Sequence, residues 1–333
     1  MTEKTTSTRL SDPSETLWID WLSPPPHVNF NTALFRALAN RRNRCVVFSD
    51  RLVVPEVACE VRSAGATRFQ QALQVRELLE ANRSVPVVLL TYDPLLLPFV
   101  RSSPERLLVF EHNTTPDSVL SKHGLWQAML CRRVMRLAQY PGQCTAIRRL
   151  GNRETYIGSP LQPAAPRTAD KRPADAPLVL LAPSERAELD RLTPFAASLK
   201  GARILAKRPR GASTGTADES NPLCLELRDW LEFVVDGTPV DGVIITTSSR
   251  IRGTGWFNDA IAHCTPLVIA TDEARDLFTA TFPSYPFIFL PDVRGPAELA
   301  ARLREAVEYD SREYIHQHND ALRQRLERCL SRL

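Results

Sequence analysis

Short apolar runs alternate with amphipathic stretches along almost the whole chain. The runs are rich in Val, Ile and Leu and lack polar alternation, a pattern typical of strands covered on both faces. In the first half they predict strands over Leu17–Leu22, Cys45–Ser49, Val85–Thr91 and Arg106–Glu111. In the second half they predict strands over Pro177–Ala182, Ala202–Ala206, Gly242–Thr247, Pro266–Ala270 and Pro286–Leu290.

Stretches with helical spacing of apolar residues lie between these runs. They predict helices over Asn31–Asn40, Ala66–Asn82, Asp117–Ala138, Glu185–Leu199, Trp256–His263 and Ala297–Tyr309. Strand–helix alternation with short joints favours parallel, doubly wound sheets. A proline-rich segment from Ser159 to Pro177 interrupts this alternation near the middle of the chain. Because proline fixes φ and removes a backbone donor, we interpret this segment as a semi-stiff linker.

We therefore expect an α/β fold with two Rossmann-like, doubly wound domains that face a cleft. The first domain covers residues 1–160, the linker 161–176 and the second domain 177–310. Residues 311–333 carry sparse apolar side chains at helical spacing, which predicts a C-terminal helix packing back across the domains.

Composition narrows the class of protein. The 333 residues are 43% hydrophobic and 24% charged, which excludes wholesale disorder and fibrous structure. The net charge of +4 and the lack of a recognition motif argue against a nucleic-acid partner. Seven scattered cysteines, never in a C-x-x-C pair, indicate reduced thiols of a cytoplasmic protein. No apolar run approaches the roughly 20 residues of a spanning helix, and Met1–Asp20 has no apolar signal core.

The most informative segment runs from Asp241 to Asp272 and predicts a strand, a glycine-containing loop, a short helix and another strand. A helix N-terminus offers unpaired N–H groups and a positive dipole end, and small residues let a phosphate approach closely. Asp259, about one turn inside the helix, is placed to present its carboxylate to ribose hydroxyls. Diphosphate binding is assigned to residues around the helix start: Ser249, Arg250, Arg252, Gly253, Thr254 and Gly255.

Lys207 and Arg208 follow a predicted strand of the same half. Open α/β sheets bind ligands at the carboxyl ends of their strands. A nucleoside diphosphate needs about two compensating charges, which these two residues could supply. A solvated basic loop is the alternative interpretation.

The segment from Asp241 to Asp272 resembles the GT-B glycosyltransferases, especially the large family-4-like group. Their carboxyl-terminal domain carries a run like EG-x-x-x-x-x-x-EA-x-A-x-G-x-P-V-I. The matching residues here are Gly253, Asp259, Ala260, Ala262, Thr265, Pro266, Val268 and Ile269, and the resemblance is clearest over about 240–308. It implies sugar transfer from a nucleotide-sugar donor to a glycan or lipid-linked acceptor, in bacterial surface polysaccharide or lipopolysaccharide assembly. No cofactor beyond this co-substrate is expected. No metal is expected either, because helix N–H groups and arginines can neutralise the leaving diphosphate.

The chain departs from the family pattern at one important position. In the family, two glutamates eight residues apart contact the donor sugar and the ribose. The second corresponds to Asp259, whereas the first falls at Ile251. This departure motivates one alternative, a catalytically silent GT-B-like module that binds a sugar, nucleotide or protein. Two others also stay open: a nucleotide-sugar epimerase that shares this architecture, and a simple strand–helix–strand packing unit. A nicotinamide dehydrogenase is disfavoured, because no G-x-G-x-x-G follows an early strand.

Candidate residues of the first half lie after predicted strands. In GT-B enzymes the loop after the first strand faces the cleft, so the resemblance implies acceptor-side contacts from His27 and Asn29. A glycosyl acceptor must lose a proton as it attacks, and a carboxylate or imidazole can take it. Asp93, Glu111 and His112 end apolar strands and are three candidates for this base. Asp93 also fits a helix start.

Residues 122–149 contain six lysines and arginines and no acidic residue, with Leu, Met and Trp interleaved. A basic amphipathic helix of this kind fits an anionic membrane surface, which predicts peripheral attachment at the inner face of the membrane. A core helix with a solvated basic face explains the same pattern.

Overall fold

The computed structural model describes residues 15–20, 27–38, 43–47, 58–62, 67–91, 97, 107–112, 121–130, 134–165, 176–183, 186–208, 223, 225–249 and 254–332. The chain divides into two compact units. Unit 1 comprises Met1–Gln139, Gln143–Ile157 and Arg323–Leu333. Unit 2 comprises Tyr140–Gly142 and Gly158–Leu322.

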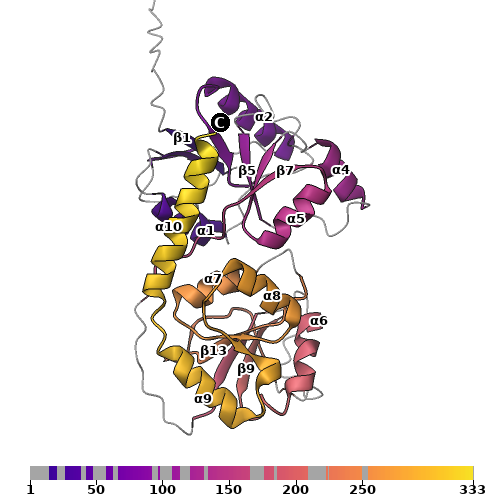
Figure 1. The fold of residues 1–333 in the computed structure, drawn as a ribbon, viewed down its shortest axis with the longest axis vertical. Coiled ribbons are helices and arrows are strands. Elements are labelled where there is room, and N and C mark those ends of the chain that lie inside the picture. Colours follow the sequence, from indigo (N-terminus) through magenta and orange to yellow (C-terminus); the bar gives the residue numbers. More distant parts are fainter. Residues whose placement is uncertain are drawn as a thin grey trace, which may run out of the picture. The chain divides into compact units, whose positions relative to one another are not determined.

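Unit 1 is built on a parallel sheet whose seven described strands follow the order β3-β2-β1-β4-β5-β6-β7 (Figure 1). They are β1 (Thr16–Asp20), β2 (Asn43–Val47), β3 (Ala58–Val61), β4 (Val87–Leu89), β5 (Leu107–Glu111), β6 (Met135–Ala138) and β7 (Arg153–Tyr156). β1, β4 and β5 are buried along their whole length, as expected of apolar strands in a sheet covered on both faces.

Four described helices accompany this sheet in the chain: α1 (His27–Ala37), α2 (Arg68–Ala81), α4 (Lys122–Leu130) and α5 (Pro141–Arg149). A capping box starts α2, in which the Thr67 hydroxyl accepts from the Gln70 N–H and the Gln70 side chain accepts from the Thr67 N–H. The buried face of α2 packs on β1 and β4 in one hydrophobic cluster.

Unit 2 contains a second parallel sheet, with six described strands in the order β10-β9-β8-β13-β14-β15. They are β8 (Val179–Ala182), β9 (Arg203–Lys207), β10 (Leu225–Arg228), β13 (Gly242–Ile245), β14 (Leu267–Ile269) and β15 (Ile288–Phe289). A small antiparallel hairpin, β11 (Val234–Val235) with β12 (Thr238–Pro239), precedes β13.

Helices cover both faces of the second sheet. α7 (Gly255–Ala262) and α8 (Asp272–Thr281) pack on one face, where Val243 and Ile245 point. α6 (Arg186–Leu189), the 3-10 turn η1 (Asp190–Phe195) and α9 (Pro296–Val307) pack on the other, with Ile244; the 3-10 turn η2 (Leu290–Asp292) precedes α9. This is the two-sided covering that defines a doubly wound sheet.

The last helix, α10 (Ser311–Leu330), contributes residues to each unit. Within unit 2, Ile315 joins the hydrophobic cluster beneath α7 and α8. Within unit 1, the Arg325 guanidinium lies 5.1 Å from the centre of the Tyr156 ring and its Nε donates to the Ile157 carbonyl at 2.9 Å.

Two predicted helices are wrong in their extent. The helix expected over Glu185–Leu199 is α6 over Arg186–Leu189 only, followed by the 3-10 turn η1. The helix expected over Asp117–Ala138 is α4 over Lys122–Leu130 only, and Met135–Ala138 form strand β6 instead. The basic stretch 122–149 is therefore not a single amphipathic helix, because strand β6 lies between α4 and α5. Arg136, which belongs to this strand, is completely buried. The described elements that sequence patterns did not predict are β3, β6, β7, β10, α5, α8 and the hairpin.

Candidate functional site

Strand order reverses once in each sheet. In unit 2 the chain moves from β8 outward to β9 and β10, and then returns to β13 on the other side of β8. In unit 1 it moves from β1 to β2 and β3, and then to β4 on the other side of β1. Open α/β sheets bind ligands outside the carboxyl ends of strands at such switch points. The ends of β8 and β13, and of β1 and β4, are therefore where functional side chains are expected.

The N-terminus of α7 follows β13 and is not covered by any described residue. Thr254 caps the helix, with its hydroxyl accepting from the Trp256 N–H at 3.3 Å. Gly255 is exposed, and apart from its chain neighbours no described atom lies within 4 Å of where its Cβ would sit. The first-turn N–H groups and the helix dipole at this end favour an anion. Ser249 is half-buried, and Arg250, Arg252 and Gly253 lie outside the described residues.

Asp259 lies one turn inside α7 and is half-buried. Its carboxylate makes no hydrogen bond or ion pair with the described part of the chain, and burial raises its pKa to about 6. Its neighbour Asn258 holds the helix by donating to the Ser159 hydroxyl at 2.7 Å and the Pro160 carbonyl at 3.3 Å. A carboxylate kept partly from water without a cationic partner costs stability and is a candidate for binding.

Lys207 and Arg208 lie at the carboxyl end of β9. Lys207 is exposed, whereas Arg208 is engaged with the neighbouring strand end. Its Nε donates to Asp229 at 2.8 Å, and a second guanidinium nitrogen donates to the Leu227 carbonyl at 3.4 Å. Arg208 thus ties the ends of β9 and β10 together, while Lys207 points its charge to solvent at the same sheet edge.

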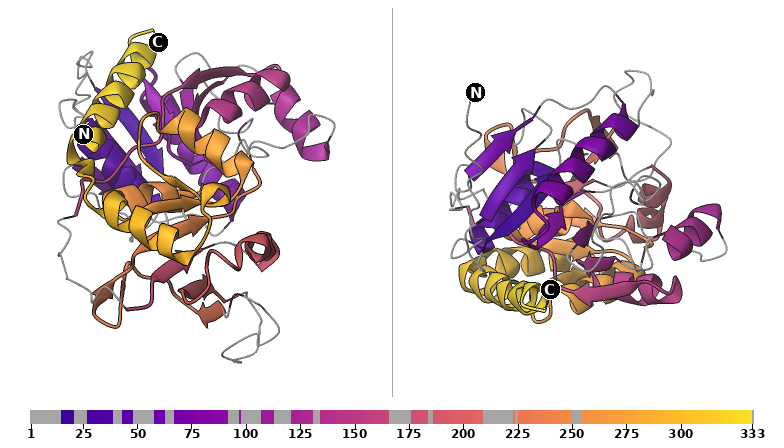
Figure 2. Two further views of the ribbon diagram at one scale, coloured as in Figure 1. Left: turned by 60° about the horizontal axis from the view of Figure 1, so that its bottom comes forward. Right: turned by 90° about the horizontal axis from the view of Figure 1, so that it is seen from above.

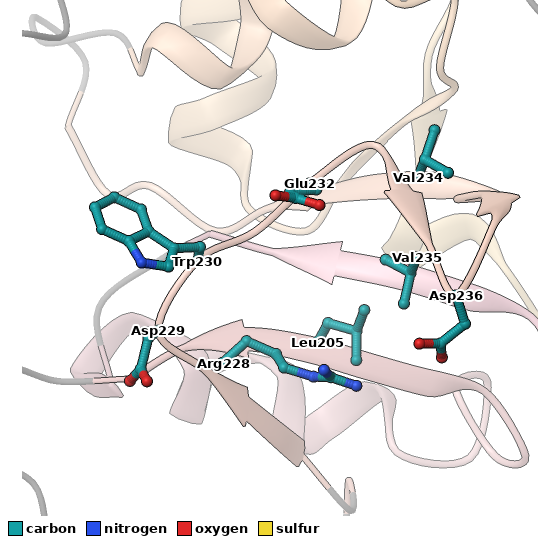
Figure 3. Close-up of a pocket in the computed structure, with 8 residues that line it drawn as sticks. All are labelled: Leu205, Arg228, Asp229, Trp230, Glu232, Val234, Val235 and Asp236. Carbon is teal, nitrogen blue, oxygen red and sulfur yellow. The ribbon is translucent and has the colours of Figure 1, made fainter.

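A cavity of about 380 Å³ lies against β9 and β10 (Figure 3). Trp230, with 81% of its surface exposed, and Glu232 follow the end of β10 and border it. Sequence patterns did not indicate this site; the available signal was a tryptophan directly after a short strand. The residues that line the cavity are Leu205, Arg228, Asp229, Trp230, Glu232, Val234, Val235 and Asp236.

At the switch point of unit 1, Asp20 ends β1 and is buried. Its two carboxylate oxygens accept from the Asn31 side-chain amide at 2.8 Å and the Thr91 hydroxyl at 2.9 Å. Asp20 thereby joins β1, α1 and the end of β4, a role that sequence patterns did not indicate. His27 and Asn29, expected in a loop, form the first turn of α1, and only their backbone is described. Asp93 lies outside the described residues.

Comparison with known proteins finds relatives only among solved structures. No protein-family profile and no curated protein sequence matches the chain. HepE of Anabaena, solved in complex with UDP-glucose, has a TM-score of 0.59 at 14% identity, covering 96% of this chain and 100% of HepE. AviGT4, a glycosyltransferase involved in avilamycin A biosynthesis, has a TM-score of 0.56 at 11% identity, covering 96% and 98% of the two chains. A glycosyltransferase of Rickettsia africae has a TM-score of 0.51 at 11% identity, covering 95% and 97%.

The chain has the GT-B fold. The predicted fold class, two Rossmann-like α/β sheets of the GT-B type, is thereby confirmed. Identities of this size establish architecture only, so the chemistry of this GT-B chain has to be argued from its own side chains.

Glu111, one of the three predicted bases, is completely buried in this GT-B chain and ion-paired with Arg136. Arg136 Nε donates to the Glu111 carboxylate at 3.0 Å, and Arg136 Nη1 donates to the side-chain oxygen of Asn152 at 3.0 Å. A carboxylate enclosed by its cation cannot reach an acceptor hydroxyl. The contact therefore indicates a structural role for Glu111.

His112 is held in one tautomer by its partners. The Leu90 carbonyl, which can only accept, lies 2.7 Å from Nε2, so Nε2 carries the proton. The Gln139 amide nitrogen donates to the Glu111 carbonyl at 3.0 Å and lies 3.1 Å from Nδ1, so Nδ1 accepts from it. Burial lowers the pKa of His112, consistent with a neutral ring whose basic nitrogen is already occupied.

Among the described residues, no three His, Cys, Asp or Glu side chains come together as ligands for a metal ion. No helix in the described part of the chain has the length and apolar character needed to cross a membrane. α4 lies at the outer edge of unit 1 in each view and exposes 50% of Leu125 and 74% of Met129 (Figure 2).

Proposed function

We propose that the protein is a metal-independent glycosyltransferase that moves a hexosyl group from a nucleotide-sugar donor to a glycan or lipid-linked acceptor in bacterial surface polysaccharide biosynthesis. The observation that carries this proposal is the combination, on α7, of a capped N-terminus that no described side chain covers with the carboxylate of Asp259, which has no partner in the described part of the chain. The first suits a diphosphate and the second suits ribose hydroxyls. HepE, which shares the fold, was solved with UDP-glucose and with UDP.

The donor is assigned to unit 2. Thr254, Gly255 and the first-turn N–H groups of α7 would hold the diphosphate, and Lys207 would add a positive charge from the same sheet edge. Arg250 and Arg252 belong to the loop before α7 and would add guanidinium groups to the diphosphate site. Ser249 and Gly253 of the same loop would also contribute to this site. These groups neutralise the leaving diphosphate without a metal ion.

The acceptor is assigned to unit 1, near His27 and Asn29 at the start of α1. The acceptor oxygen attacks the anomeric carbon, the bond from that carbon to the diphosphate oxygen breaks, and the nucleoside diphosphate leaves with the bonding electron pair. Because Glu111 and His112 are both engaged, the acceptor proton would pass to Asp93 or to the leaving diphosphate.

Replacing Gly255 with aspartate tests the diphosphate site. The added carboxylate would occupy the place where the phosphate is proposed to bind, so we expect Kd for a nucleoside diphosphate to rise at least tenfold in isothermal titration calorimetry. Folding should be unaffected, because acidic residues are favourable in the first turn of a helix.

Gly295→Asp is the matched control, since Gly295 is the equally open N-cap of α9 in the same unit. It should leave nucleotide binding unchanged. Unchanged affinity in Gly255→Asp, or an equal loss in both variants, would refute the diphosphate site. A protein that binds nucleotide but transfers no sugar with a full panel of donors would be a binding module instead.

For the membrane partner, we propose α4 rather than the whole stretch 122–149 as the point of contact. Leu125 and Met129 lie one turn apart and are exposed, and no acidic residue occurs between 122 and 149. Leu125→Ser/Met129→Ser should abolish cosedimentation with phosphatidylglycerol vesicles. Phe69→Ser/Leu73→Ser, which alters an exposed apolar pair on α2, should not. Equal binding by both double variants would contradict the proposal.

A further inference from the structure

We infer that the cavity beside β9 and β10 holds the base of the donor nucleotide and that its chemistry selects guanine over uracil. This inference rests on the proposed function and deepens it by naming the donor class. It depends on three features of the described residues: an exposed aromatic face, a carboxylate without a described partner, and a cavity that extends from Trp230, past the carboxyl end of β10, to Asp236, which is paired with Arg203 at the start of β9 (Figure 3).

The position fits one nucleoside diphosphate that spans both sites. β10 lies three strands from β13, which at ordinary strand spacing is about 14 Å. The loop after β10 also reaches α7 directly, since the rings of Phe233 and Trp256 are 5.6 Å apart at their centres. Phe233 directly follows Glu232 and also stacks on His263, the C-cap of α7, with 4.1 Å between ring centres, so the loop that borders the cavity packs along the length of α7.

Trp230 provides a surface for stacking. It lies directly after β10 and is 81% exposed, although a tryptophan normally buries most of its area. The cavity of about 380 Å³ falls within the size range of small-molecule sites. Stacking on an indole favours any flat base and does not distinguish one from another.

The polar lining supplies the selectivity. Of its three carboxylates, Asp229 is paired with Arg208 at 2.8 Å and Asp236 with Arg203 at 2.9 Å. Glu232 makes no hydrogen bond or ion pair with the described part of the chain. Guanine presents two adjacent N–H donors that match one carboxylate, whereas uracil presents a single N–H between two carbonyl oxygens. The two oxygens of Glu232 therefore fit guanine in a bidentate manner and oppose the carbonyls of uracil.

Kd values for GDP and UDP, measured by titration of the native protein and of two variants, test the inference. GDP should bind the native protein at least about tenfold more tightly than UDP. Glu232→Gln should remove that preference by weakening GDP alone, because the amide replaces one acceptor with a donor. Trp230→Ala should weaken both nucleotides. Glu305→Gln, which changes an exposed carboxylate on α9, is the control and should alter neither Kd.

The outcomes distinguish a wrong assignment of the base from a wrong proposal of donor binding. Tighter binding of UDP than GDP, or an equal effect of Glu232→Gln on both, would overturn the assignment of guanine while leaving the donor site in place. A loss of affinity in Glu232→Gln that affects GDP and leaves UDP unchanged, together with weaker binding of both nucleotides by Trp230→Ala, would support it. If the native protein bound neither nucleotide, the proposed function would fall together with the inference.

Discussion

Replacing Arg136 with methionine is expected to lower the free energy of unfolding by about 3–5 kcal/mol. Arg136 and Glu111 are both completely buried, and they belong to the neighbouring strands β6 and β5. Methionine fills much of the arginine volume, so the loss comes chiefly from leaving the Glu111 carboxylate buried without its cation and Asn152 without its donor. Equilibrium unfolding in urea, followed by circular dichroism, measures this loss.

A double variant separates the charge from the packing. Glu111→Gln/Arg136→Met removes both charges and should recover a large part of the stability lost in Arg136→Met. Arg76→Met breaks the exposed ion pair with Glu80 on α2 and should change stability little. If Arg136→Met were as mild as Arg76→Met, the buried pair would not support the sheet.

This pair also explains why sequence patterns misplaced β6. A basic residue within Met-Arg-Leu-Ala suggests the polar face of a helix, since an arginine is rarely buried without a partner. Its partner Glu111 lies 25 residues earlier in the chain, and only the parallel pairing of β5 with β6 brings the two together. Periodicity is a local property and carries no information about such a contact, whereas the uninterrupted apolar runs of β4 and β13 predicted their strands correctly.

The same contrast between local sequence patterns and contacts of distant segments applies to the candidate site. The start of α7 could be predicted, because a threonine cap, a glycine and the preceding apolar strand lie close together in the sequence. The accessibility of the α7 N-terminus, the exposure of Trp230 and the lack of a partner for Asp259 among the described residues depend on how distant segments pack. For the same reason the sequence suggested Glu111 as a base, although its environment makes it a structural residue.

Replacing Asp259 with asparagine is expected to stabilise the protein and to weaken donor binding at the same time. Burial raises the pKa of this carboxyl from 3.8 to about 6, a difference that corresponds to roughly 3 kcal/mol against the charged form. Because the folded-state pKa is the higher one, the native protein has its full stability from this group below about pH 4 and loses it as the pH rises through 6. The variant should therefore match the native protein in acid and exceed it by up to about 3 kcal/mol above pH 6.

Donor affinity should change in the opposite sense. Hydrogen bonds from ribose hydroxyls to a carboxylate contribute about 1.5–3 kcal/mol, so Asp259→Asn should raise Kd for a nucleoside diphosphate tenfold or more at pH 8. In the native protein, Kd should rise as the pH falls through 6 and the carboxyl becomes protonated, whereas in the variant it should stay constant over this range. Urea unfolding at pH 4 and pH 8 and calorimetric titration at pH 5 and pH 8 measure the two effects, with Asp292→Asn, which changes an exposed carboxylate of unit 2, as the control. A variant that gained stability without losing affinity would contradict the proposal that Asp259 binds the donor. The burial of this carboxylate would then cost stability without contributing to donor binding.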